Sequence, residues 1–370
     1  MYKDLAAAVS LSVLSNQGTL KLWDKMKDHH PLDLFDFYKK NQTINTQSFI
    51  EKIYGSDPEA ASEKIIEASI KKNISIVSFW DSTYPPLLKE ISCPPVVLFS
   101  SAESIPQKCI AIVGSRKIDS RMKGVTRRIA RDCSKAGYTI VSGMALGADR
   151  EAHCGTLECG GATMGILANG IDIEYPASNR DIYKEIKNSY NSLLISEYPP
   201  GCIAGKWTFV KRNRIISGLS EAVVVTRAAI KSGALITANY ALEQNREIFA
   251  CPGLPYDDVS AGTNKLIKDG AKLVDSSVDI IDEMNLRKGF SVKKNDLLLR
   301  DKEDTIPFDF SDTEPEVKKI LDYLSNGESP IDNMARELKI AVSRIHEVIS
   351  LLEIEGIVKR NGNNIFRMHT

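Results

Sequence analysis

The spacing of hydrophobic and polar positions divides the chain into segments of different character. Up to about residue 75, apolar positions recur at helical spacing in three stretches, Leu5–Leu14, Gly18–Met26 and Phe49–Ile70. Polar turns separate these stretches. The pattern predicts a small helical domain over residues 1–75, of the SAM-like or helix-hairpin-helix-like kind.

Prolines give residues 76–108 a different pattern. Ile76–Trp80 is apolar and predicts a strand. The proline pairs within Tyr84–Leu88 and Cys93–Phe99 predict extended chain, because proline fixes φ and restrains the residue before it. We expect this segment to join the edge of the sheet that follows.

From Cys109 to about Ile281, strand-length apolar runs alternate with helical stretches. The runs are Cys109–Val113, Thr139–Ser142, Ala162–Ala168, Ser192–Ser196, Ala222–Thr226, Glu247–Cys251 and Lys272–Val274. Helical stretches between them include Arg121–Lys135, Arg150–Cys159, Arg180–Tyr190 and Ile236–Gln244. The alternation predicts an α/β domain over residues 76–283, with an extended Rossmann-like, doubly wound, mostly parallel sheet.

The rest of the chain predicts a linker and a third domain. Residues 284–314 are polar and charge-rich, which is typical of a linker. Three helical stretches follow at Glu316–Leu324, Ile331–Leu338 and Ser343–Glu355, and then a hairpin that joins Ile357–Arg360 to Ile365–Met368. Three helices and a hairpin predict a C-terminal winged-helix domain over residues 315–370.

Composition narrows the expected functions. Lys plus Arg and Asp plus Glu number 48 each, so a nucleic-acid site must be a local patch rather than a basic footprint over the whole protein. The seven cysteines are scattered and suggest no disulfide framework. Neither a signal peptide nor an apolar segment of about 20 residues is present, so we expect a cytoplasmic protein without a membrane partner.

Candidate binding residues follow the predicted strands. In a doubly wound sheet the carboxyl ends of the strands face the ligand crevice. Gly114, Ser115 and Arg116 follow the first strand, and Arg116 offers a forked cation that suits phosphate. Gly143 and Asn169 follow the next two strands. Each of these turns could equally be an ordinary turn between elements.

Two basic segments strengthen the hypothesis of a phosphate site. Lys206–Arg214 holds four cations and two aromatic residues without an acid, and cations with aromatic faces are how proteins hold single strands. Its candidate contacts are Lys206, Phe209, Arg212 and Asn213. Lys231, Ser232 and Gly233 precede a predicted helix, whose N-terminus favours an anion.

Several motifs of enzymes and cofactor sites are missing. The chain has neither the P-loop motif nor the Gly-x-Gly-x-x-Gly motif of dinucleotide sites. His153, Cys154 and Cys159 share a helical stretch without further ligands at a suitable spacing, and we interpret them as packing residues. Asp149 is interpreted as a helix cap. We therefore expect no metal, no cofactor and no catalytic residues.

The motifs, in their order along the chain, resemble the DprA/Smf family of DNA-processing proteins. The resemblance covers the whole Rossmann-like region and rests on several separated motifs. They are Val113–Arg116, Ser142–His153, Asn169–Pro176 with Asn179, Ser196–Gly201, Phe209–Ser217, Lys231–Leu242, Cys251–Gly253 and Ala261–Asn264.

This resemblance implies a non-enzymatic protein that binds single-stranded DNA. It further implies protection of incoming DNA in natural transformation, loading of RecA, and a homodimer. The family's binding roles transfer to Arg116, Lys206 and Phe209. Two alternatives stay open: a nucleotide or nucleoside-monophosphate hydrolase on a related fold, and a regulator that binds duplex DNA through the winged helix.

Overall fold

A computed structural model gives the fold of the chain. It describes residues 2–14, 21–41, 45–287, 315–324, 327–354, 358–361 and 364–367. The described residues fall into two compact units, divided near residue 292. Each unit is described by itself.

Five helices form the N-terminal part of the first unit: α1 (Tyr2–Ser12), α2 (Leu22–Met26), α3 (Pro31–Asn41), α4 (Ser48–Tyr54) and α5 (Pro58–Lys71). The sequence patterns missed α3. They also merged α4 with α5, which a turn at Gly55 separates before Asp57 caps α5 by accepting from the Ala60 N–H at 2.9 Å. These helices share one continuous hydrophobic cluster with the sheet, so the domain boundary near residue 75 stays a prediction.

Nine strands form one sheet in the order β1-β2-β6-β5-β4-β3-β7-β8-β9. At one edge, β1 pairs antiparallel with β2, and β2 pairs antiparallel with β6. Every pairing from β6 to β9 is parallel, which confirms the mostly parallel Rossmann-like sheet. The strand bounds are β1 Ser75–Ser78, β2 Val97–Ser100, β3 Cys109–Val113, β4 Thr139–Gly143, β5 Thr163–Leu167, β6 Leu193–Ser196, β7 Ala222–Val225, β8 Glu247–Ala250 and β9 Lys272–Leu273.

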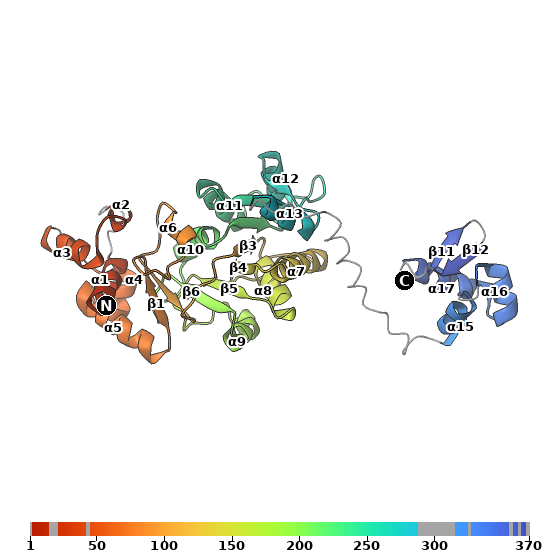
Figure 1. Ribbon diagram of the computed structural model, residues 1–370, viewed down its shortest axis with the longest axis horizontal. Coiled ribbons are helices and arrows are strands. Elements are labelled where there is room, and N and C mark those ends of the chain that lie inside the picture. The colour runs from red at the N-terminus through yellow and green to blue at the C-terminus, as the bar shows by residue number, and fades with distance from the viewer. Residues whose placement is uncertain are drawn as a thin grey trace. The chain divides into compact units, whose positions relative to one another are not determined.

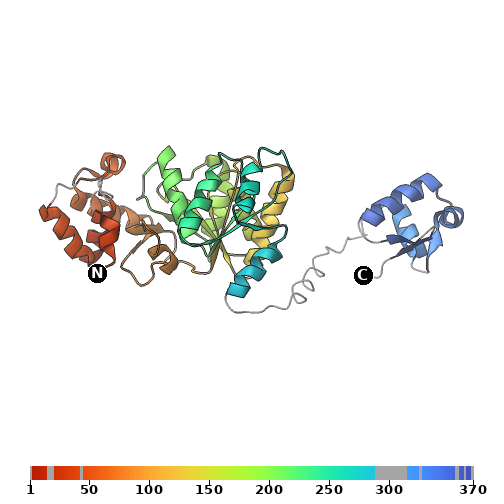
Figure 2. The ribbon, with the colours of Figure 1, turned by 90° about the horizontal axis from the view of Figure 1, so that it is seen from above.

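Helices cover both faces of the sheet (Figure 1 and Figure 2). Side chains alternate along β3, so that Ile110 and Ile112 join one buried cluster while Ala111 and Val113 join the other. The helix bounds are α6 Pro86–Lys89, α7 Ser120–Lys135, α8 Ala148–Glu158, η1 Ala177–Asn179, α9 Arg180–Asn188, α10 Lys206–Gly218, α11 Gly233–Glu243, α12 Ala261–Lys268 and α13 Ser277–Arg287.

Two helices correct the sequence analysis. The segment Tyr84–Leu88 was expected to be extended, but its second proline begins the short helix α6, since proline is tolerated in the first turn of a helix. The basic run was assigned no secondary structure, and it forms the first nine residues of α10. This helix decides which of its cations reach solvent.

The second unit contains α15 (Pro315–Leu324), α16 (Ile331–Leu338) and α17 (Val342–Ile354). Its strands β10 (Ser329–Pro330), β11 (Val358–Asn361) and β12 (Asn364–Arg367) form a sheet in the order β10-β12-β11. These elements match the three helices and the hairpin that the sequence predicted, while their assignment as a winged helix stays a prediction. The predicted linker begins too early, because α13 continues to Arg287, and residues 288–314 lie outside the described residues.

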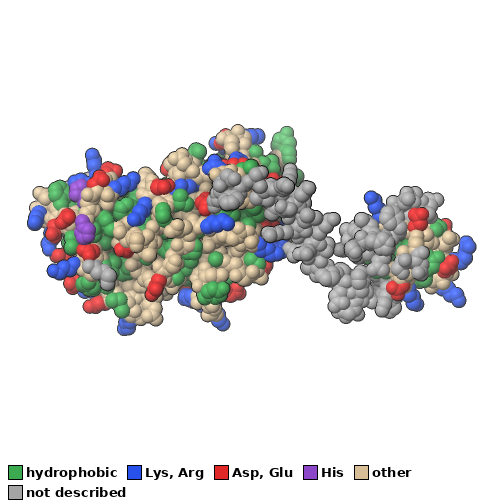
Figure 3. Space-filling model, in the orientation of Figure 1, with side chains coloured by type: hydrophobic (Ala, Val, Ile, Leu, Met, Phe, Trp, Pro, Cys, Tyr) green, Lys and Arg blue, Asp and Glu red, His purple; other side chains and the backbone are tan. Residues whose placement is uncertain are grey.

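The surface reflects the balanced composition. On the face drawn in Figure 3, basic and acidic side chains intermingle over the N-terminal helices. Within the described ranges, no helix is both long enough and apolar enough to cross a membrane. Because the two signs of charge are mixed on this face, a binding site for phosphates must be a local cluster of basic residues.

Candidate nucleic-acid interface

A cleft opens where the strand order of the parallel sheet reverses. β3 lies between β4 and β7, so the chain leaves β3 on one side and returns on the other, which is where doubly wound sheets bind ligands. The cleft has a volume of about 510 Å³. The loops after β3, β4 and β5 line it, together with α10 and the first turn of α11. Eight of the twelve predicted binding residues line this cleft: Gly114, Arg116, Lys206, Phe209, Arg212, Asn213, Ser232 and Gly233.

Arg116 and two aromatic rings form one wall of the cleft. The Arg116 guanidinium carbon lies 5.5 Å from the centroid of the Phe209 ring, and the Phe209 and Tyr175 rings lie 5.8 Å apart. The Tyr183 hydroxyl donates to the Tyr175 carbonyl at 2.9 Å and so holds that loop in place. Arg116 is exposed, and no ion pair engages it within the described part of the chain. The wall combines a free cation with aromatic surface.

Two helix N-termini also line the cleft. Lys206 is the first residue of α10 and is exposed. Ser232 caps α11 by accepting from the Ala234 N–H at 3.3 Å, and Gly233 leaves the helix end accessible. Asn213 links the two helices, since its amide nitrogen lies 3.5 Å from the Gly233 carbonyl. The partial positive charge of a helix N-terminus adds to the attraction of Lys206 for an anion.

The floor of the cleft is polar and buried. Arg212 is 5% exposed and donates to the Ile166 carbonyl at 2.5 Å. Asp149 is also buried, and burial raises its pKa to about 6 although the Arg212 charge opposes the rise. The Asp149 carboxylate accepts from the Ala145 N–H at 3.4 Å. α8 begins after Gly147 and no side chain caps it, so the interpretation of Asp149 as a helix cap is wrong.

The four cations of the basic run therefore have different roles. Arg214 is buried and paired with Glu197, whose side chain is 13% exposed, and the Lys211 ammonium lies 3.5 Å from the same carboxylate. Arg212 supports the floor. Lys206 alone in this run is exposed and lacks such a partner among the described residues. Of the two cations of this run that were predicted to contact DNA, Lys206 is exposed, whereas Arg212 is buried and engaged inside the protein.

A glycine positions the turn that carries Arg116. Gly147 has φ +76°, which side chains rarely tolerate. A Cβ at Gly147 would lie 2.4 Å from the Ser115 carbonyl oxygen and 2.6 Å from the Arg116 carbonyl carbon. The loop after β4 thus packs directly against the backbone of the Gly-Ser-Arg turn. The two loops form one wall because no side chain separates them.

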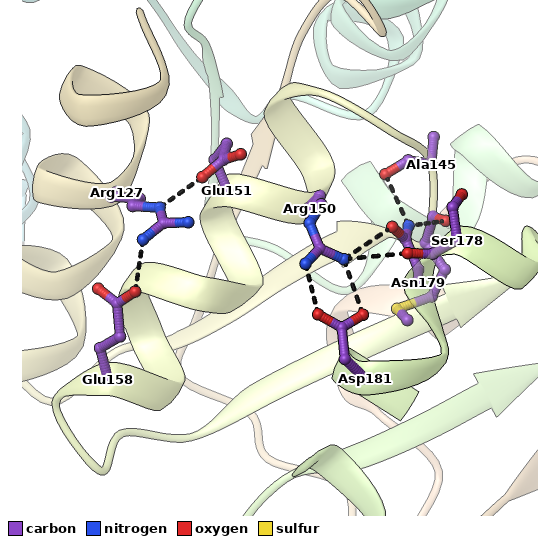
Figure 4. A network of polar contacts seen from close by, with 9 residues as sticks. Arg127, Ala145, Arg150, Glu151, Glu158, Ser178, Asn179 and Asp181 are labelled. Carbon is purple, nitrogen blue, oxygen red and sulfur yellow. Dashed lines mark hydrogen bonds and ion pairs between the residues drawn. The ribbon is translucent and has the colours of Figure 1, made fainter. Parts of the chain in front are cut away.

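A polar network formed by α8, η1 and α9 holds the loop after β4 in place. Arg150 on α8 pairs with both carboxylate oxygens of Asp181 and donates to the Asn179 side-chain oxygen at 3.1 Å (Figure 4). Asn179 in turn donates to the Met144 and Ala145 carbonyls at 2.9 and 3.2 Å. In the same view, Arg127 bonds to two glutamates and ties α7 to α8. The cleft is therefore built on fixed elements.

Four predicted residues do not line the cleft. The Ser115 hydroxyl bonds within its own turn, donating to the Lys117 carbonyl at 2.9 Å. Gly143 packs against the Arg212 guanidinium, where a Cβ would lie 2.4 Å from a nitrogen. The Asn169 amide donates to the Gly170 and Ile173 carbonyls and shapes a buried loop. Lys231 is exposed beside the cleft lining.

The sequence analysis missed other lining residues, chiefly Tyr175 and Val210. Tyr175 lies in the segment Asn169–Pro176 that resembles the family, and its position after a strand end was the available signal. The described residues include no cluster of His, Cys, Asp and Glu that could hold a metal ion. His153 is buried, and burial lowers its pKa to about 4, so it is uncharged at neutral pH.

The sequence was also compared with families and relatives. The family model described as DNA recombination-mediator protein A matches residues 75–285. The chain belongs to this family, DprA/Smf. It is 34% identical to Protein Smf of Synechocystis over 341 residues, which cover 84% of each chain. It is 34% identical to DNA processing protein DprA of Streptococcus pneumoniae over 275 residues, 74% of this chain and 94% of the relative.

Two solved DprA structures resemble this fold. The protein of Streptococcus pneumoniae superposes with a TM-score of 0.54 at 33% identity, covering 64% of this chain and 83% of that one. DNA processing protein A of Helicobacter pylori superposes with a TM-score of 0.52 at 28% identity, covering 59% and 98%. The description of the latter structure concerns its single-stranded DNA binding mode.

Proposed function

We propose that this protein binds single-stranded DNA in the cleft, as a mediator of DNA recombination. The observation that carries the proposal is the grouping of Arg116, Lys206 and Phe209 at the point where the sheet order reverses. The cations attract phosphates, while a base can stack on the face of the aromatic ring. Each of the bases can stack in this way. Binding of this kind tolerates any sequence.

The shape of the cleft supports a strand over a free nucleotide. Among the described residues, its two free cations, Arg116 and Lys206, line the cleft and are exposed to solvent. The alternative of a nucleotide hydrolase expects a glutamate beside the loop after β8. That loop carries two aspartates, Asp257 and Asp258, and no glutamate. Asp257 accepts from the Ser260 hydroxyl and pairs with Arg227, so it supports the loop. The duplex-binding alternative depends on the second unit.

The relatives support the finer parts of the proposal. The matched family is named for recombination mediation, and the Helicobacter pylori relative is described as binding single-stranded DNA. From the resemblance of the sequence motifs to this family, we further propose a role in processing DNA taken up in natural transformation, loading of RecA onto the bound strand, action as a homodimer, and location in the cytoplasm.

One experiment tests the proposed function. The full chain is titrated with a labelled oligo-dT strand and with the matched duplex over a series of salt concentrations, and fluorescence anisotropy gives the affinity. We expect tighter binding to the single strand than to the duplex, with affinity that falls as salt rises, because phosphate contacts release counterions. Equal affinity for both forms, or release of phosphate from nucleotides, would contradict the proposal.

A further inference from the structure

A large aromatic side chain next to Lys206 is not part of the cleft. Trp207 is 48% exposed, although two rings hold it in place. Its ring centroid lies 5.1 Å from that of Phe49 on α4 and 5.9 Å from that of Tyr198, both in edge-on geometry. These contacts fix the indole while about half of its surface stays open to solvent.

Further apolar side chains surround this tryptophan. Ile203 is 79% exposed and lies in the loop between Gly201 and Gly205. That loop spans from Ile53 to Trp207, since a Cβ at Gly201 would lie 3.7 Å from Ile53, and one at Gly205 would lie 3.3 Å from the indole nitrogen. We call the surface formed by Phe49, Ile53, Ile203 and Trp207 the α4–α10 patch.

The charges at this patch favour an anion. Lys52 is exposed on α4, three residues after Phe49, so the two lie on the same side of that helix. Lys206 adjoins the patch along the chain. Two carboxylates of neighbouring loops are already engaged: Asp172 pairs with Lys72, and Glu197 pairs with Arg214. Glu51 on α4 is exposed, so the two lysines exceed it by one positive charge.

We propose that the α4–α10 patch binds a second stretch of the same DNA strand, with Trp207 stacking on a base and Lys52 contacting a phosphate. The inference rests on the proposed function, because it extends the site in the cleft. Consecutive residues, Lys206 and Trp207, join the two surfaces, so one strand that contacts Lys206 can continue onto the indole. An exposed aromatic ring beside a cation is the arrangement that binds successive bases of a single strand.

The experiment compares strand lengths. Affinity is measured for oligo-dT of about 6 and about 16 nucleotides, a span of lengths that single-stranded sites cover. We expect Trp207→Ala to weaken binding of the long strand about 5- to 150-fold while leaving binding of the short strand unchanged, since one stacked base is lost. Trp207→Phe retains a ring and should keep most of the affinity.

Two further measurements separate stacking from a structural role. Lys52→Ala changes only an exposed side chain. It should weaken binding of the long strand and lower the salt dependence of that binding. The chain has three tryptophans, so quenching of their fluorescence by the long strand should persist in Trp80→Phe and disappear in Trp207→Phe. Trp80 is a suitable control because its indole nitrogen donates to the His29 carbonyl at 2.8 Å within the N-terminal part.

The outcomes are distinguishable. Wild-type protein that binds the long strand, with Trp207→Ala equally tight, overturns the inference alone. Equal weakening of both lengths by Trp207→Ala also overturns it, because the tryptophan then acts by holding α10. Wild-type protein that binds neither length overturns the proposed function and the inference together.

Discussion

Replacement of Arg116 by alanine is the sharpest test of the cleft. The side chain is exposed and contacts the Phe209 ring, and no ion pair of Arg116 occurs in the described part of the chain. The cation–π contact exists before and after DNA binds, so its loss largely cancels in the free energy of binding. What is lost is one charge-assisted hydrogen bond to a phosphate, worth about 1.5–3 kcal/mol. The affinity for oligo-dT should therefore fall about 10- to 150-fold.

The salt series gives a second measured quantity, the slope of log affinity against log salt concentration. Each phosphate contact to a single strand contributes about 0.7 to the slope of log affinity against log salt concentration. Arg116→Ala should lower the magnitude of the slope by that amount, and Lys206→Ala should do the same. Lys71→Ala is the matched control, because it removes one exposed cation at the end of α5 without touching the cleft.

The melting temperature completes this test. Arg116→Ala should leave it close to the wild-type value, since the residue is exposed. Wild-type affinity and slope in both cleft variants would refute the assignment of the site. So would an equal loss in Lys71→Ala, because the binding would then follow net charge rather than these residues.

Three other predictions concern the supports of the cleft. Gly147→Ala should destabilise the fold by about 1–3 kcal/mol in chemical denaturation and also weaken DNA binding, because its Cβ pushes into the Arg116 turn. The pKa of Asp149 is about 6 in the folded protein and 3.8 in the unfolded chain, so its contribution to stability is complete below pH 3.8 and is lost as the pH rises through 6. At 1.36 kcal/mol per pKa unit, this contribution is about 3 kcal/mol. Asp149→Asn should remove this part of the pH dependence of the free energy of unfolding. Arg150→Ala removes the cation that chiefly lowers the pKa of Asp181 to about 2, so an NMR titration of the variant should find that pKa nearer 3.8. The variant should lose at most about 1 kcal/mol of stability, because the ion pair is partly exposed.

The parallel strands were predictable to within one or two residues. A strand buried on both faces, such as β3 (Cys109–Val113), appears as a continuous apolar run between polar turns. Helix α10 was not predictable from periodicity, because Arg212 and Arg214 are buried although both are charged. A local signal did exist, since the Thr208 hydroxyl accepts from the Gly205 N–H at 2.9 Å and caps the helix.

The location of the site was predictable for a topological reason. Residues that follow parallel strands gather at one edge of the sheet, and so Arg116 and Gly114 meet α10 and α11 in one cleft. Side-chain roles were not predictable in the same way. Whether Ser115 offers its hydroxyl to a ligand or to the Lys117 backbone depends on the path of the turn, which residue types alone do not determine.

This distinction between exposed and buried cations changes the expected salt dependence. Counting the cations of the sequence motifs would include Arg116, Lys231 and the four in the basic run, and six contacts predict a slope of about 4. Three of those six are engaged within the protein: Lys211 and Arg214 with Glu197, and Arg212 with the Ile166 carbonyl. The remaining three cations, Arg116 and Lys206 in the cleft and Lys231 beside it, predict a slope near 2 for a strand bound there. A measured slope well above 2 with a long strand would then require cations outside the cleft, and Lys52 on the α4–α10 patch is the first to test.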